Sequence, residues 1–150
     1  MDDQQTWQRT QQLLDAFKQL GCDDADRWAR SEIEDDIPQL ARYRFVSTLW
    51  PQMIDSWHDG MPHIPAAQRA LDAGVSEDDL TLLARAVAYE TVFLMLHHLG
   101  AEHDAADELP SWALAELTPA GAATGRHLAA LHEDLLALDP SGREGDDLWT

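Results

Sequence analysis

The sequence predicts a mostly α-helical protein, a single compact domain of five to seven helices around a central buried helix at about residues 77–99. Ala (22) and Leu (21) dominate the 150 residues, whereas Val and Ile together number eight. Ala and Leu favour helices, whereas the β-branched residues Val and Ile favour strands. A hydrophobic content of 45% is enough for a core in a chain of this length. Apolar residues also recur at helical spacing along most of the chain.

Helical spacing predicts helices over 6–20, 23–33 and 38–50, and a short helix over 66–73. Gly21 lies just past the first of these, where glycine commonly ends a helix. Pro38 favours a first helical turn and disfavours helix in the residue before it. Pro51 is expected to kink or restart the third helix, which then continues to Gly60.

The strongest local signal precedes the helix expected over 77–99. Ser76 is a good N-cap residue, and Asp79 stands three positions later as its capping-box partner. Val75 and Leu80 occupy the two positions of a hydrophobic staple. Between Leu82 and Leu99 the sequence is apolar almost all round the helix, which predicts the central buried helix.

The last third of the chain is expected to begin with an acidic linker at about 101–110 and to end in an acidic tail at about 139–150. Residues 112–117 are compatible with either helix or strand, and a small β-hairpin near 112–127 stays open. An amphipathic helix is expected over 126–138. The segment Asp139-Pro140-Ser141-Gly142-Arg143-Glu144 resembles a motif, but turn chemistry accounts for it.

Charge excludes more functions than any other feature of the sequence. The chain has 28 Asp and Glu against 10 Lys and Arg, a formal net charge of −18 and a pI of about 4.4. This charge repels nucleic acids and anionic membranes, so we expect neither as a partner. A halophilic host, a solubility strategy or a basic partner would explain the acidity. Nine Arg, one Lys and no Asn suggest a high-GC prokaryotic genome.

Cysteine usage and hydropathy predict a cytoplasmic protein. Cys22 is alone, so an intramolecular disulfide is excluded, and the adjacent Asp23 and Asp24 disfavour its thiolate. The polar, acidic N-terminus has no signal-peptide pattern, and no apolar run approaches 18 residues.

Seven histidines raise the alternative of a helical enzyme that uses a divalent transition metal, although no cofactor is the simpler expectation. Metal ligands on one helix face need spacings of three or four residues, which the pairs of candidates lack. The weak candidates are His97, His98, His103 and His132. The helix dipole alone explains two of them, His97 and His98, in a last helical turn.

Glu90 is the one weak catalytic candidate, because it lies in the most apolar stretch of the chain. A carboxylate there must be paired, protonated or functional, since an unpaired buried charge is costly. We expect a buried ion pair with Arg42, Arg44 or Arg85. The remaining alternatives are a general base or metal ligand, and partial exposure.

No catalytic motif is found, so a protein-interaction module is the leading hypothesis. It is expected to bind a basic partner, as a regulatory, inhibitor or immunity-like protein does, and homo-oligomerisation is compatible with it. Residues 101–150 carry −9 of the net charge, and two tryptophans there have no obvious place in a core. The candidate binding residues are Trp112, Trp149, Asp104, Asp107 and Glu108, whereas Trp7, Trp28, Trp50 and Trp57 are expected in the core.

Overall fold

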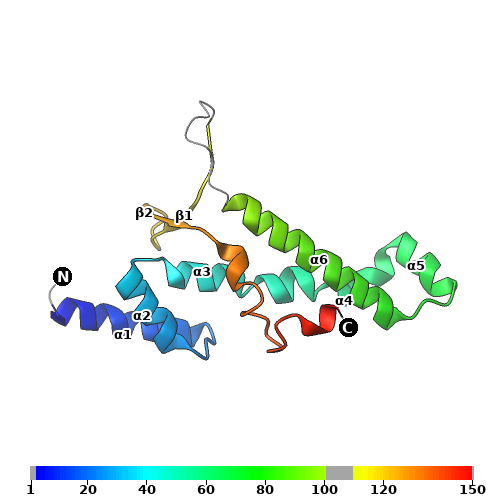
Figure 1. Cartoon of the computed structure of the whole chain (residues 1–150), viewed down its shortest axis with the longest axis horizontal. Coiled ribbons are helices and arrows are strands. Elements are labelled where there is room, and N and C mark those ends of the chain that lie inside the picture. Colours follow the sequence, from blue (N-terminus) through cyan, green and yellow to red (C-terminus); the bar gives the residue numbers. More distant parts are fainter. Residues whose placement is uncertain (1–2, 101–109, 150) are drawn as a thin grey trace. The chain divides into compact units, whose positions relative to one another are not determined.

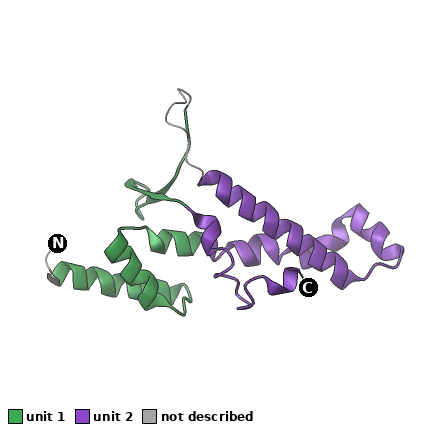
Figure 2. Ribbon diagram, viewed as in Figure 1, with its two compact units in different colours: residues 1–45, 102–129 green, residues 46–101, 130–150 purple. Residues whose placement is uncertain are grey.

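The computed structural model describes residues 3–100 and 110–149 and has the predicted mostly helical fold, with the small hairpin that the sequence left open. Figure 1 shows the order of the elements along the chain. The chain divides into two compact units, residues 1–45 with 102–129 and residues 46–101 with 130–150 (Figure 2). The helices and strands are α1 (Asp3–Gln19), α2 (Ala25–Asp35), α3 (Gln39–Val46), α4 (Trp57–Gly60), α5 (Pro65–Asp72), α6 (Glu77–Leu99), β1 (Leu114–Leu117) and β2 (Ala123–Leu128).

The first unit contains α1, α2, α3 and the hairpin. Three aromatic rings pack together in it, the buried Phe17 and Tyr43 and the half-buried Trp28, with centroids 6.2 Å apart for Phe17 and Trp28, 5.7 Å for Phe17 and Tyr43, and 5.4 Å for Trp28 and Tyr43. Leu13 and Ala29 are also buried here. Trp7 is 64% exposed, so its expected place in the core is wrong. It lies in the first two turns of α1, away from the ring cluster.

The hairpin resolves the ambiguity at 112–117 in favour of a strand. β1 and β2 are antiparallel, with Leu114 opposite Leu128 and Leu117 opposite Ala123. The helix expected over 126–138 is wrong, because β2 runs to Leu128 and only a 3₁₀ turn follows at Leu131–Asp134. Ala130 has a left-handed backbone (φ 51°), which no helix allows. Strand pairing overrides the helix propensity of this segment.

A buried carboxylate, Glu32 on α2, connects three parts of the first unit. It is 3% exposed and accepts a hydrogen bond from the Leu40 backbone at 2.8 Å and from the guanidinium of Arg126 at 3.0 Å. Arg126 also donates to Glu116 at 2.7 Å. Burial acts to raise the pKa of Glu116, but the hydrogen bonds from Arg126 and Thr124 outweigh it and lower that pKa. These ion pairs hold the hairpin against α2.

The second unit is built on α6 and on the turns that follow α3. Trp50 begins a π-helical turn (Trp50–Ile54), is fully buried, and donates from its indole nitrogen to the Leu135 carbonyl at 2.7 Å. A 3₁₀ turn (Met61–His63) joins α4 to α5. The core also contains apolar side chains that are distant in sequence: Ile54, Met61, Leu96, Leu131, Leu135 and Leu148.

The segment 139–149 packs into the second unit rather than trailing from it. The Asp139 carboxylate is 7% exposed and accepts backbone hydrogen bonds from Ser141 at 2.8 Å and from Gly145 at 3.0 Å. Gly145 has φ 75°, and a Cβ there would meet Leu136 at 3.0 Å. Leu148 is buried beyond this turn. Turn chemistry thus accounts for the motif-like segment, as predicted.

Candidate functional site

Helix α6 has the predicted bounds and cap, but its predicted burial is wrong. Ser76 accepts a hydrogen bond from the Asp79 backbone at 3.0 Å, as expected for the capping box. Of its 23 residues only Tyr89 and Leu96 are buried. Leu83, Val87, Leu94 and Met95 are each more than half exposed. A helix can be apolar all round because one face packs inward and the other remains an open apolar surface.

The inward face of α6 is held by one ion-pair network and by aromatic contacts. Arg85 donates to Asp55 at 2.9 Å and to Asp147 at 2.6 Å. The hydrogen bond from Arg85 is the main cause that lowers the pKa of Asp147. One turn on, the Tyr89 ring lies 5.9 Å from Trp50 and 6.2 Å from Trp149. These contacts fix the rotation of α6 about its axis.

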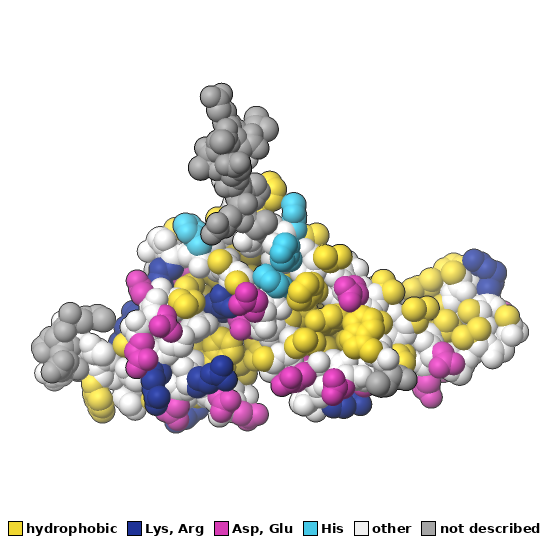
Figure 3. All heavy atoms as spheres, viewed as in Figure 1, with side chains coloured by type: hydrophobic (Ala, Val, Ile, Leu, Met, Phe, Trp, Pro, Cys, Tyr) yellow, Lys and Arg dark blue, Asp and Glu magenta, His cyan; other side chains and the backbone are white. Residues whose placement is uncertain are grey.

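The outward face of α6 forms one wall of an apolar groove of about 560 Å³. Its residues recur at helical spacing: Leu80, Leu83, Ala84, Val87, Ala88, Thr91 and Val92. The opposite wall comes from the turns before α5 and from α5 itself: Met53, Trp57, Met61, Ile64, Ala66, Ala67 and Ala70. Figure 3 shows hydrophobic side chains at the molecular surface over α5 and α6. Trp57 was expected in the core, but its side chain is 38% exposed and lines this groove.

The groove offers an occupant almost no hydrogen bonds. Apart from the Trp57 indole, the one polar side chain that lines the groove is that of Thr91. The Thr91 hydroxyl already donates a hydrogen bond to the Val87 carbonyl at 2.8 Å. An occupant must therefore satisfy its own backbone polar groups. A helix does this and an extended segment does not.

Glu90 is exposed, so the predicted buried ion pair is wrong. Among the described residues it has no hydrogen bond or ion pair, and Arg85 is engaged with Asp55 and Asp147 instead. With Leu83, Val87 and Leu94 it forms a row at positions i, i+4, i+7 and i+11, one stripe along a helix. A carboxylate thus stands within an exposed apolar stripe beside the groove.

Of the other predicted binding residues, the structure describes two, one in each unit. Trp112 is 46% exposed in the first unit, and Trp149 is 60% exposed in the second, with its ring edge-on to Tyr89. Asp104, Asp107 and Glu108 lie outside the described residues.

Two of the metal candidates come together, and no third donor of the described residues joins them. The rings of His97 and His132 lie 5.0 Å apart, and His132 also meets Phe93 edge-on at 5.3 Å. His98 is exposed, and His103 lies outside the described residues. Within 3–100 and 110–149, no group of three or more His, Cys, Asp or Glu is placed to hold a metal ion. The aromatic contacts give His132 a packing role.

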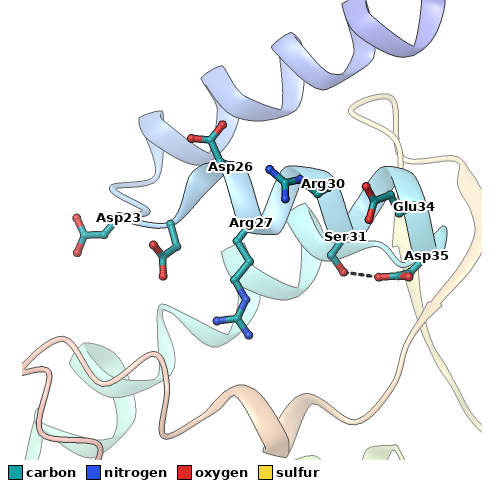
Figure 4. A pocket seen from close by; sticks show the side chains of 8 residues that line it. Asp23, Asp26, Arg27, Arg30, Ser31, Glu34 and Asp35 are labelled. Atoms are coloured by element: carbon teal, nitrogen blue, oxygen red, sulfur yellow. Dashed lines mark hydrogen bonds between the residues drawn. The ribbon is translucent and has the colours of Figure 1, made fainter. Parts of the chain in front are cut away.

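A second hollow, of about 420 Å³, lies along α2 in the first unit and is lined by charged side chains. Figure 4 shows that these side chains point away from one another rather than toward a common centre. Acidic Asp23, Asp26 and Glu34 are interspersed with Arg27 and Arg30. Ser31 donates to Asp35 at 2.8 Å within the same helix. This arrangement is a solvated helix surface.

The surroundings of Cys22 disfavour its thiolate. Its side chain is buried, and burial is the main cause that raises the pKa of its thiol. Hydrogen bonds with the Asp24 backbone and with Tyr43 oppose this rise, and the charges of Asp23 and Asp24 add to it. Burial and the contact with Cys22 likewise raise the pKa of Tyr43 to about 12. The expectation that the neighbouring aspartates disfavour the thiolate agrees with this direction.

Among the described residues, α6 is the one helix long and apolar enough to cross a membrane by length and composition. Its hydropathy comes from the two apolar faces together. Arg85, on the inward face, is held by two carboxylates of the second unit.

Comparison of the chain with protein-family models, with curated proteins and with solved structures finds no match.

Proposed function

We propose that this protein is an interaction module that binds a basic protein partner through the groove of its second unit. The module would act as a regulatory, inhibitor or immunity-like protein. The observation that carries the proposal is the open apolar groove on the outward face of α6. Exposed apolar surface rimmed by polar residues is typical of protein interfaces.

The charge of the second unit supports a basic partner. Residues 46–101 and 130–150 contain 13 Asp and Glu against three Arg. Two of those arginines, Arg85 and Arg143, are ion-paired with Asp147. A partner of opposite charge would be steered to this unit and held there more weakly as salt rises. The same charge opposes an anionic membrane surface.

Photo-crosslinking from the groove tests the proposal. A benzoylphenylalanine at position 87 is expected to capture a discrete partner protein in cells of the source, whereas the same group at exposed Asp78 is not. The purified partner should then bind the wild-type chain at least about tenfold more tightly than a Val87→Asp variant, with Asp78→Asn unchanged. The affinity should fall between low and high salt.

Three results contradict the proposal. One is crosslinking from position 87 only to lipid or to a second copy of the chain. Another is an affinity that Val87→Asp leaves unchanged. The third is binding that is insensitive to ionic strength, which would remove the electrostatic part of the proposal.

A further inference from the structure

We infer that the occupant of the groove is an amphipathic helix that carries a basic side chain, best an arginine, within its apolar face and places it over Glu90. This inference rests on the proposed function and deepens it, because it assigns the conformation of the partner and one specific contact.

The first step concerns conformation. The groove is bounded by helices and offers almost no hydrogen-bonding groups, so a bound segment must pair its own backbone groups. The apolar face of α6 extends from Leu80 to Met95, sixteen residues whose fifteen steps span roughly 22 Å at the helical rise. An amphipathic helix of about four turns covers such a length, a familiar mode of groove recognition.

The second step concerns Glu90. A partner that covers Leu83, Val87 and Leu94, which are 57–62% exposed, also removes water from the carboxylate in the same row. Desolvating an unpaired carboxylate is costly, so a purely apolar partner is selected against. A cation placed over Glu90 offsets that cost, and a guanidinium does so with two directed hydrogen bonds.

The third step excludes the other occupants. A second copy that met this groove with its own second unit would bring together two surfaces that each carry 13 acidic groups against three arginines, and two of those arginines are already paired with Asp147. Acyl chains over the stripe would desolvate the same carboxylate without a partner. Arg69 on α5 is the third arginine of the unit, and it does not line the groove.

The test uses the full chain and three synthetic 18-residue amphipathic helices that share one apolar face. They carry Arg, Gln or Glu at the centre of that face. Binding is followed by calorimetry at fixed ionic strength, with wild type, Glu90→Gln and the matched control Glu77→Gln, which lies on α6 outside the groove. Neutral phosphatidylcholine vesicles and sedimentation of the chain alone complete the experiment.

We expect the Arg peptide to bind about tenfold more tightly than the Gln peptide, and the Glu peptide to bind most weakly. Glu90→Gln should abolish the preference for Arg over Gln, and Glu77→Gln should preserve it. The inference is overturned if the peptides bind equally, if the preference survives Glu90→Gln, or if vesicle binding or self-association occupies the groove.

Failure of this inference is distinguishable from failure of the proposed function. Equal binding of all three peptides that Val87→Asp abolishes leaves a binding groove without the Glu90 contact. Absence of binding by every peptide, or binding that Val87→Asp does not weaken, overturns both.

Discussion

Glu32 and Glu90 are both carboxylates within helices, and their surroundings are opposite. Glu32, on α2, is 3% exposed and is held by Arg126, Arg9 and a backbone amide. Glu90, on α6, is exposed in an apolar row. The buried ion pair expected at Glu90 is found at Glu32 instead. The hydrophobicity of the flanking sequence therefore does not indicate burial, because it does not show which other segments cover the helix.

The largest expected effect separates these two carboxylates. Replacing Glu32 by Gln should lower the free energy of unfolding by about 3 kcal/mol, since it leaves Arg126 with less of its buried charge compensated. Replacing Glu90 by Gln should change it by less than about 0.5 kcal/mol, as for an exposed site. Urea unfolding of both variants measures the difference. Equal losses would show that the two carboxylates have similar surroundings.

Asp139 gives a second contrast between a buried and an exposed acid. Asp139→Ala should cost about 2 kcal/mol, because two backbone amides of the turn lose their acceptor. Glu133→Gln, at an exposed position of the preceding turn, serves as the control and should have almost no effect. Thermal unfolding compares the pair, and a control as destabilised as Asp139→Ala would contradict the assigned role of the turn.

The ion pair between Arg85 and Asp147 predicts a pH dependence. The pKa of Asp147 is lowered from 3.8 in the folded state, so its stabilising contribution is present above that value and is lost as pH falls through the lowered pKa. An Arg85→Met variant should be about 1 kcal/mol less stable than wild type at pH 7. Between about pH 5 and pH 2 its free energy of unfolding should fall less than that of wild type. Unfolding midpoints against pH measure this. Parallel curves would contradict the pairing.

The smallest effect concerns the outward face of α6. Val87→Asp should change stability by less than about 0.5 kcal/mol, because Val87 is 57% exposed. Tyr89→Ala, two residues on and packed against Trp50, is the reference for the inward face and should cost about 3 kcal/mol. Urea unfolding of the two variants shows whether the faces differ as described.

Local signals predicted much of the fold. The capping box of α6, the glycine after α1 and Pro38 before α3 all depend on neighbouring residues, and the structure has helices at each. The hairpin was only an open alternative, and the helix over 126–138 was wrong. Residues 123–128 pair with β1 instead, and Arg126 pairs with Glu32, 94 residues away; local propensity contains neither contact.

The candidate site was less predictable than the fold. Periodicity showed that α6 is apolar on both faces, but it did not show which face is covered. The opposite wall, from Met53 to Ala70, comes from short turns and from α5. The helices expected up to Gly60 and over 66–73 did not show that these residues face α6. The one sequence signal for the groove was a second apolar face on α6, opposite Tyr89 and Leu96. The acidity of residues 101–150 led to the prediction of a binding site there instead.

The central claim is that α6 has an open face that binds a basic helical partner. Thiol accessibility tests this claim most directly. Cys22 is the one native cysteine and is buried, so it is an internal standard for slow labelling. In a Val87→Cys variant, maleimide should modify position 87 rapidly, and the Arg-bearing helix should protect it while the Glu-bearing helix does not. Labelling of position 87 as slow as that of Cys22, or equal protection by both peptides, would contradict the account.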